Sequence, residues 1–356
     1  MRKWGLLAAA LSLTLAACAG GGTTGSTPTG SAEGDGAATA TNSRLNAIKS
    51  RGQLVCGVEG TIPGFSSVGS DGSYSGLDVD VCRAVAAAVL GDPEAVEYRN
   101  LDSTERFTAL RGGEVDMLSR NTTWTLSRDA AGGNAMEFAP TTFFDAQGMM
   151  VRADSGIETL EDLEGRSICV ETGTTTELNL TSRMTELGVN YTDVKFQDGN
   201  ETAQAYIEGR CDGLTSDKSQ LNARRTKFPT PDDHVILDVS MSKEPLGPVT
   251  MNNDSGMFDV VRWVVYGLIQ AEEFGITQAN VDQIASSTTN QDVKLLLGTE
   301  GDLGTQLGLD NDFMVDVIKA VGNYGEIYDR NIGEDIPRGL NQLWTDGGLM
   351  YSPPFR

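Results

Sequence analysis

Histidine is almost absent from this chain of 356 residues, and its cysteines form no Cys-x-x-Cys pair. His234 is the only histidine, and it follows Pro231-Asp232-Asp233 on what reads as a solvated loop. A zinc site needs several histidine or cysteine ligands, and hydrolase triads need a histidine base. The sequence also lacks a phosphate-binding P-loop and a dinucleotide fingerprint. These absences argue against a metal site, a cofactor and hydrolase chemistry.

Positive charge is also scarce. Lysine and arginine number 27 against 50 aspartates and glutamates, which gives a net charge of −23. Nucleic-acid binding requires a basic face, so this balance argues against it. Beyond the N-terminal region no apolar run is long enough to cross a membrane. With 39% hydrophobic residues, the chain has the composition and length of a globular protein with two domains.

The N-terminus has the pattern of a bacterial lipoprotein signal peptide. Arg2 and Lys3 precede an apolar run from Trp4 to Leu15 that is too short for a membrane-spanning helix. The run ends in Leu15-Ala16-Ala17-Cys18, which matches the lipobox, where the cysteine is lipidated and becomes the new N-terminus. We expect a signal peptide over 1–17, lipidation at Cys18 and a flexible Gly/Ser/Thr-rich tether over 18–42. The alternative is an ordinary signal peptide with a chance cysteine.

Export permits disulfide bonds. Without Cys18, four cysteines remain, and four allow three pairings. They fall as two well-separated couples along the chain, so we predict Cys56–Cys82 and Cys169–Cys211, one bond in each domain. Loops of these lengths would stabilise the fold by roughly 3–4 kcal/mol each in the chain-entropy account.

Strand and helix patterns alternate along the chain. In the first part, apolar strand patterns over 53–58, 95–98 and 115–118 alternate with helical patterns over 81–90 and from Asp102, which begins a predicted capping box with Glu105. The pattern restarts with strands near 143–151, 166–171, 194–196 and 211–214 and helices over 176–187 and 201–209. This order predicts parallel sheets flanked by helices, with ligands at the carboxyl ends of the strands.

The motifs in this order resemble one protein family. Besides the lipobox they are GLDVDV (76–81), NTTWTLSR (121–128), DLEGRSICVETGTT (162–175), CDGLTSD (211–217), GLNQLW (339–344) and GGLMYSPP (347–354). The sequence resembles the polar-amino-acid substrate-binding proteins of ABC transporters, called the family 3 solute-binding proteins. Within that family it resembles the general L-amino-acid binders and the related glutamate/glutamine/aspartate/asparagine binders. The similarity covers about residues 43–356.

The resemblance implies an α/β, two-lobed periplasmic-binding-protein type II fold, with two crossover strands and a helical C-terminal extension. The crossings are expected near 145–151 and 240–249. Lobe 1 would then comprise 43–146 plus 245–275, and lobe 2 would comprise 147–244. The extension, 276–356, should pack back on the lobes.

The resemblance also implies a binding site for a free amino acid. Arg128 matches the family's carboxylate-binding arginine, whose fork bonds two oxygens at once. Thr123 matches a hydroxyl ligand, and Asn121 matches the position whose backbone carbonyl takes the ammonium group. On the facing half, Thr174 and Thr175 open a helix, and Thr175 matches a carboxylate donor. Asp217 matches the ammonium-binding aspartate.

Other readings of these residues stay open. Arg128 could form an exposed pair with Asp129, and Thr174, Thr175 and Asp217 could be plain helix caps. Trp124 could be a wall or a core residue. Glu59, Phe65 and Ser103 stand on neighbouring loops, where a contact with the ligand's side chain and a core or surface role are equally compatible. Arg120 either neutralises an acidic side chain, favouring acidic or amide ligands, or pairs on the surface. Glu59 would favour basic ligands.

The resemblance therefore implies a monomeric, exported receptor, anchored to the membrane through Cys18 at the cell envelope. It would capture L-amino acids, of broad or polar, acidic or amide type, and deliver them to the permease and ATPase subunits of an ABC importer. The alternatives are an enzyme on the same fold, such as a cyclohexadienyl dehydratase, and an amino-acid sensor. The intact pair of Arg128 and Asp217 favours binding over catalysis.

Overall fold

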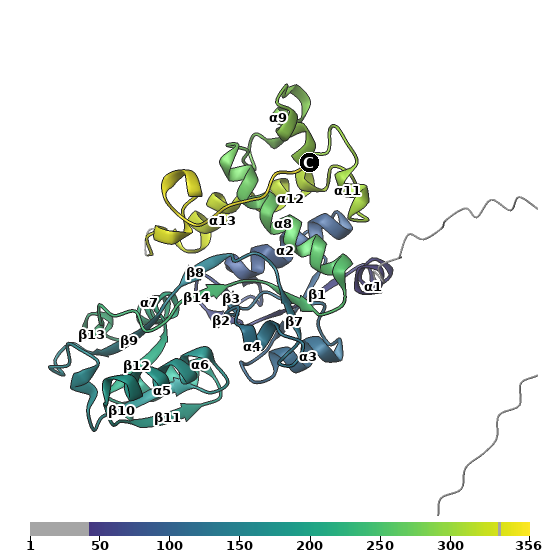
Figure 1. The fold of residues 1–356 in the computed structure, drawn as a ribbon. Coiled ribbons are helices and arrows are strands. Elements are labelled where there is room, and N and C mark those ends of the chain that lie inside the picture. Colours follow the sequence, from purple (N-terminus) through teal and green to yellow (C-terminus); the bar gives the residue numbers. More distant parts are fainter. Residues whose placement is uncertain (1–42, 334–335) are drawn as a thin grey trace, which may run out of the picture. The chain divides into compact units, whose positions relative to one another are not determined.

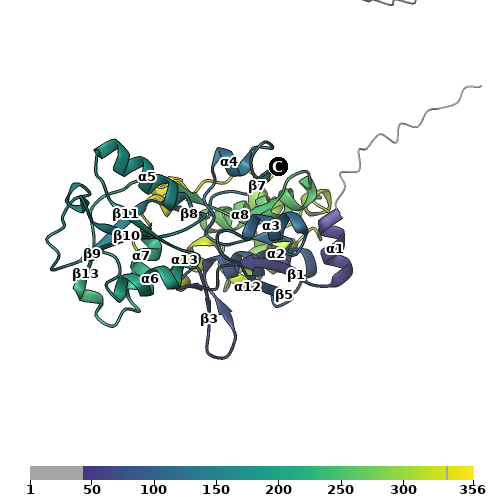
Figure 2. The same cartoon turned by 90° about the horizontal axis from the view of Figure 1, so that it is seen from below.

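The computed structural model describes residues 43–333 and 336–356. The predicted signal peptide, the tether and the lipidation candidate Cys18 lie outside these described residues. The described chain contains two mixed sheets, each covered by helices, which form the cores of two lobes (Figures 1 and 2). No helix in the described ranges is long and apolar enough to span a membrane.

The sheet of lobe 1 has the strand order β5-β1-β6-β15-β7. Strand β1 is parallel to its neighbours β5 and β6, whereas β15 is antiparallel to β6 and β7. The strands are β1 (Leu54–Val58), β5 (Val96–Asn100), β6 (Met117–Leu118), β7 (Met136–Phe138) and β15 (Val249–Met251). Its helices are α1 (Ser43–Arg51), α2 (Leu77–Leu90), α3 (Arg106–Gly112), α4 (Leu126–Asp129) and α8 (Ser255–Glu273). The small strands β2 (Thr61–Ile62), β3 (Ser66–Val68) and β4 (Tyr74–Ser75) form a separate sheet.

Two predicted helix starts were wrong. Helix α2 begins at Leu77 rather than at Val81, because Gly76 breaks the chain at a φ of 134° and two aspartates in the first turn favour a helix N-terminus. Helix α3 begins at Arg106 rather than after Asp102. Asp102 instead closes the preceding turn, where its carboxylate accepts hydrogen bonds from the backbone of Thr104 and Glu105.

The sheet of lobe 2 has the order β11-β10-β12-β9-β13, in which β10 is parallel to β11 and β12 and β9 is antiparallel to β12 and β13. The strands are β9 (Gln147–Arg152), β10 (Ser167–Glu171), β11 (Thr192–Phe196), β12 (Gly213–Asp217) and β13 (His234–Ile236). The helices are α5 (Thr175–Leu187), α6 (Gly199–Ile207) and α7 (Lys218–Arg225), with 3-10 turns η1 (Glu161–Leu163) and η2 (Pro231–Asp233).

His234 is not solvated as predicted. It opens strand β13, is 3% exposed, and its Nδ1 lies 3.0 Å from the hydroxyl of Tyr206. The prediction failed because the turn before it ends in a strand that pairs with β9 at Arg152. Among the described residues no group of histidine, cysteine, aspartate and glutamate side chains is arranged to hold a metal ion.

The chain passes between the two sheets on β8 (Phe143–Asp145) and returns on β14 (Glu244–Leu246). These two strands pair with each other antiparallel, and Asp145 lies directly opposite Glu244. We call this pair the hinge strands. The exact bounds of the lobes on either side stay a prediction.

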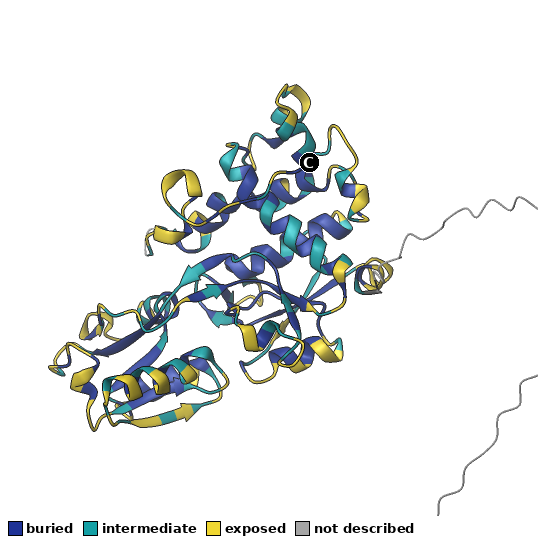
Figure 3. Cartoon of the chain, viewed as in Figure 1, coloured by how far each residue is buried: buried dark blue, intermediate teal, exposed yellow. Residues whose placement is uncertain are grey.

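The C-terminal extension is helical and shares one hydrophobic core with α2 and α8 (Figures 1 and 3). It comprises α9 (Val281–Ser287), α10 (Gln291–Leu296), α11 (Leu303–Gln306), α12 (Phe313–Val321), α13 (Tyr324–Asn331), η4 (Gly339–Asn341) and η5 (Trp344–Asp346). Asn341 also holds the hinge, because its amide exchanges hydrogen bonds with the backbone N–H and carbonyl of Phe144 on β8.

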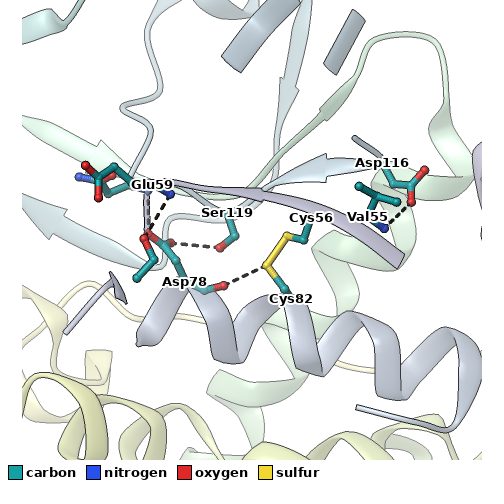
Figure 4. Close-up of a disulfide and its surroundings, with 9 residues drawn as sticks. Val55, Cys56, Glu59, Asp78, Cys82, Asp116 and Ser119 are labelled. Atoms are coloured by element: carbon teal, nitrogen blue, oxygen red, sulfur yellow. Dashed lines mark hydrogen bonds between the residues drawn. A yellow bond between two sulfur atoms is a disulfide. The ribbon is translucent and has the colours of Figure 1, made fainter. Parts of the chain in front are cut away.

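Both predicted disulfides are confirmed. Cys56 on β1 bonds Cys82 on α2 in lobe 1 (Figure 4), and Cys169 on β10 bonds Cys211 in lobe 2. All four cysteines are buried. Each bond therefore ties an interior strand to another segment of the same lobe, and neither bond links one lobe to the other.

Candidate functional site

One cavity lies at the carboxyl ends of strands from both sheets. Glu59 follows β1, Ser103 and Arg120 stand on the loops after β5 and β6, and Glu171 and Asp217 end β10 and β12. The lining residues are Glu59, Ile62, Ser103, Arg106, Arg120, Asn121, Thr123, Arg128, Glu171, Thr174, Thr175, Thr176, Ser216, Asp217 and Gln220. This is the place where parallel sheets bind ligands.

Nine of the eleven candidate ligand residues line this cavity. The two exceptions are Phe65 and Trp124. Phe65 is 1% exposed and packs edge-on against Phe143 in the core of lobe 1. Trp124 is 47% exposed and stacks on Phe138. Neither aromatic ring faces the cavity as its wall.

Arg128 is held in the cavity by the short helix α4. Thr125 caps this helix by accepting a hydrogen bond from the backbone of Arg128, and the guanidinium donates to the carbonyl of Thr123 at 2.8 Å. The side chain is buried, which rules out the exposed pair with Asp129. Burial lowers the pKa of Arg128 to about 10, so it remains a cation at neutral pH. It forms no ion pair with any described residue, so its remaining donors are available for an anion.

The loop before Arg128 is positioned by a buried carboxylate on α2. Asp78 accepts hydrogen bonds from the hydroxyl of Ser119 at 3.0 Å (Figure 4) and from the backbone N–H of Asn121 at 2.8 Å. Asn121 has a φ of 35°, a conformation rare for residues other than glycine. Burial raises the pKa of Asp78 to about 7. Asp78 therefore acts from outside the cavity and fixes a strained residue of its wall.

Two hydroxyls of the cavity, one from each lobe, meet a carboxylate on the hinge. Thr123 and Thr175 both donate to Oε2 of Glu244, at 2.5 and 2.9 Å. Glu244 is 1% exposed and also accepts from Asn179 and Ser242. A hydroxyl has one proton, so both threonines present lone pairs, not protons, to the cavity.

Thr174 is the N-cap of α5. Its hydroxyl accepts a hydrogen bond from the backbone of Glu177 at 3.1 Å, which is the plain capping role, and it also donates to the carbonyl of Glu171 at 2.7 Å. Thr175 is the first residue of the helix, and its side chain points to Glu244 instead. Thr174 thus caps the helix, and Thr175 forms part of the cavity wall.

Asp217 ends β12 on lobe 2 and is buried. Its Oδ2 accepts from the amide of Gln220 at 3.1 Å, whereas Oδ1 has no hydrogen-bond partner among the described residues. It stands at the N-cap position of α7 but makes no capping bond, which removes that alternative. Burial and the nearby carboxylates of Asp145 and Glu244 raise its pKa. A cation beside Asp217 would relieve this penalty.

Two buried ion pairs cross from one lobe to the other at the cavity. Arg120 on lobe 1 lies 3.8 Å from Glu171 on lobe 2, and Glu171 also accepts from the hydroxyl of Ser103 at 2.5 Å. In the opposite sense, Glu59 on lobe 1 lies 3.5 Å from Arg224 on lobe 2. Arg120 is therefore neither on the surface nor free, and Glu59 is paired as well.

Residues 54–334 match the family described as bacterial extracellular solute-binding proteins, family 3. The chain belongs to this family. Membership places the chain among extracytoplasmic binding proteins and confirms the expectation that it is not an enzyme.

The family 3 chain is similar along 90% of its length to two named relatives. It is 49% identical to the general L-amino acid-binding periplasmic protein AapJ of Rhizobium johnstonii, covering 90% of this chain and 95% of the relative. It is 48% identical to the glutamate/glutamine/aspartate/asparagine-binding protein BztA of Rhodobacter capsulatus, with the same coverage. A solved structure from Brucella ovis, an ABC transporter periplasmic binding protein with glutathione bound, matches with a TM-score of 0.84 at 48% identity, covering 88% of this chain and 99% of that one.

Sequence reasoning missed several residues of this family 3 site. The most notable is Arg106, which is 3% exposed and opens α3. Its Nε has no hydrogen-bond partner among the described residues, and its Nη1 lies 3.5 Å from the hydroxyl of Thr122. Burial and the neighbouring Arg128 and Arg120 lower its pKa. Its position just after the loop that follows β5, at one of the predicted binding loops, was the sequence feature that could have identified it. The other missed residues are Ile62, Glu171, Thr176, Ser216, Gln220, Glu244 and Arg224.

Proposed function

We propose that this protein is the substrate-binding component of an ABC importer and that it captures free L-amino acids in the cavity between its lobes. One observation carries the proposal: Arg128 on lobe 1 and Asp217 on lobe 2 line the same cavity, and neither forms an ion pair with a described residue. An amino acid carries a carboxylate and an ammonium on one carbon. Burying both is favourable only where each meets an opposite charge and hydrogen bonds.

The head group would lie between these two residues. Arg128 binds the carboxylate, assisted by the N-terminus of α5. Asp217 binds the ammonium, together with the carbonyl of Asn121. Thr123 and Thr175 donate their protons to Glu244, so one of them accepts the third proton of the ammonium and neither donates to the carboxylate. This last assignment differs from the role that the family resemblance implied.

The charges favour polar and acidic side chains. Arg106 is a third buried arginine of the wall and, like Arg128, lacks a carboxylate partner among the described residues. Among the lining residues, two cations without a carboxylate partner and one carboxylate without a cationic partner complement a ligand with two carboxylates and one ammonium. This agrees with what the names of the two relatives say they bind: L-amino acids in general, and glutamate, glutamine, aspartate and asparagine.

A second candidate ligand is a short γ-glutamyl peptide. The Brucella ovis relative is described with glutathione bound. Glutathione has the head group of an amino acid at its glutamyl end and a second carboxylate at its other end. It therefore presents the same set of charges to Arg106, Arg128 and Asp217.

We also propose that the mature protein is anchored through a lipid on Cys18, outside the cytoplasmic membrane, and hands its ligand to a permease driven by a separate ATPase. The lipobox supports the anchor. Radiolabelled palmitate should enter the wild-type chain and not Cys18→Ser, and the variant should leave the membrane fraction. An unlabelled, soluble wild-type protein would disprove the anchor without touching the binding proposal.

The binding proposal is tested with the purified chain lacking its predicted signal peptide. Mass spectrometry of the denatured protein identifies any ligand that copurifies, and calorimetry then measures glycine, the nineteen standard L-amino acids and glutathione after unfolding and refolding. We expect micromolar or tighter binding for at least one polar or acidic L-amino acid. If no amino acid binds below the millimolar range, the proposal is wrong.

A further inference from the structure

Four buried or half-buried charged side chains at the cavity are paired with each other between the two lobes. Arg120 and Glu59 belong to lobe 1, and their partners Glu171 and Arg224 belong to lobe 2. The side chains of Arg120 and Glu171 are 5% and 16% exposed, and those of Glu59 and Arg224 are both 7% exposed. Water therefore screens these pairs weakly, and the loss of a partner is costly.

The two pairs differ in how firmly their members are held. Glu59 receives two further hydrogen bonds from Thr61, at 2.5 Å each, and Arg224 donates to Asn200. The Nε of Arg120 donates to the carbonyl of Leu101. Its Nη2 lies 3.8 Å from Oε1 of Glu171, which is longer than a hydrogen bond. The Arg120–Glu171 pair therefore has donors and lone pairs left over, and both of its members line the cavity.

We propose that Arg120 and Glu171 form an exchangeable pair that sets the side-chain specificity of the site. This inference rests on the proposed function. A terminal amide inserts between them, since its carbonyl accepts from Arg120 and its N–H donates to Glu171. A terminal carboxylate takes Arg120 as its partner and displaces Glu171, which keeps the hydroxyl of Ser103. A short neutral side chain leaves the pair intact.

The pair explains how one site accepts amide and acidic ligands together. A free arginine in this position would bind carboxylates and reject amides, because an amide leaves its charge uncompensated. With Glu171 opposite, Arg120 is neutralised for every neutral ligand. The cost is a weaker preference for acids, since an acidic ligand must replace the carboxylate of Glu171. Glu171 is thus the residue that keeps the specificity broad.

The test removes one charge of the pair while keeping its shape. Glu171→Gln in the chain lacking its predicted signal peptide is compared with the wild type by calorimetry against L-glutamate and L-glutamine. We expect the ratio of the two dissociation constants to shift toward L-glutamate by about tenfold or more, since Arg120 has lost its competing anion. Arg120→Gln should shift the ratio in the opposite direction, toward L-glutamine. The matched control is Glu186→Gln, an exposed glutamate of lobe 2 paired with Arg183.

The control has the same change of net charge and should leave the ratio within twofold of the wild type. Thermal unfolding monitors folding, and if Glu171→Gln does not fold, Arg120→Gln alone decides. A ratio unchanged in the folded variants overturns the exchange while the amino-acid site stands. A wild type that binds neither ligand, nor any other amino acid, overturns the proposed function and this inference with it.

Discussion

Replacing Arg128 should weaken ligand binding more than any other single change in the cavity. Arg128 is 6% exposed, its pKa of about 10 keeps it charged at neutral pH, and the hydrogen bond from its guanidinium to the carbonyl of Thr123 uses only one donor. In Arg128→Lys the charge remains but the two-pronged fork to the carboxylate is lost. A hydrogen bond to a charged group contributes about 1.5–3 kcal/mol, which corresponds to roughly 10- to 150-fold in affinity.

Arg128→Ala removes the charge as well and leaves the ligand's carboxylate buried without a partner. Breaking a buried ion pair costs about 3–5 kcal/mol, so affinity should fall roughly 150- to 5,000-fold. Calorimetry with the ligand that binds the wild type most tightly measures both variants. The control is Arg99→Ala, an exposed arginine of β5 that pairs with Glu97, which should bind like the wild type.

Folding has to be checked in the same experiment, because Arg128 also lies 5.5 Å from the ring centre of Phe107 and donates to the carbonyl of Thr123. Because these two contacts are the ones that the substitutions remove, thermal unfolding of the unliganded variants should show only a modest loss of stability. Binding by a folded Arg128→Lys and Arg128→Ala within threefold of the wild type would refute the assignment of the carboxylate to Arg128.

Three further changes test other parts of the structure. The pKa of Asp217 is raised by burial and by two neighbouring carboxylates, so the affinity for an ammonium ligand should fall as the pH drops and Asp217 takes up a proton. The variant Asp217→Asn should bind the ligand weakly at every pH. Calorimetry of both proteins from pH 5 to 8 measures the difference. The pKa of Asp78 is raised from 3.8 to about 7, so its contribution to the free energy of unfolding is complete below pH 4 and is lost as the pH rises through 7. Denaturant titrations should show that Asp78→Asn loses less stability than the wild type over that pH range, by on the order of 4 kcal/mol. Equal pH profiles of the variant and the wild type would contradict the burial argument. Replacing Cys169 and Cys211 by serine should destabilise lobe 2 by about 4 kcal/mol in chemical unfolding, without weakening binding at low temperature by more than a few-fold.

The parts of the site that follow strands could be predicted from the sequence. The alternation of apolar strand patterns and helices fixes which loops meet at one edge of a sheet, so Asn121, Thr123 and Arg128 were expected to lie with Ser103. The two disulfides followed from the spacing of the cysteines. These features depend on short segments or on the general geometry of parallel sheets.

The residues that were missed depend on contacts between segments far apart in the chain. Glu244 is on the hinge and reaches both lobes at once, and nothing in its local sequence indicates two threonine partners. Glu171 and Arg224 were missed because their partners Arg120 and Glu59 belong to the other lobe.

A local pattern also failed at Asp102, and at Phe65 it left a ligand contact and a core role open. Asp102 has the spacing of a capping box with Glu105, yet it closes a turn and the helix starts later, at Arg106. Phe65 follows a strand whose neighbours line the cavity, but its ring is large and apolar and finds more contacts in the core against Phe143.

The central claim is that Arg128 and Asp217 hold the two charges of one amino-acid head group from opposite lobes. Calorimetry of the wild type with the L-amino acid that binds most tightly, its α-carboxamide and its N-acetyl derivative tests this most directly. The carboxamide removes the charge that faces Arg128, and acetylation removes the charge that faces Asp217. We predict that each derivative binds at least about 100-fold more weakly than the parent, since each leaves a buried charge unpaired. Binding of either derivative within threefold of the parent would contradict the account.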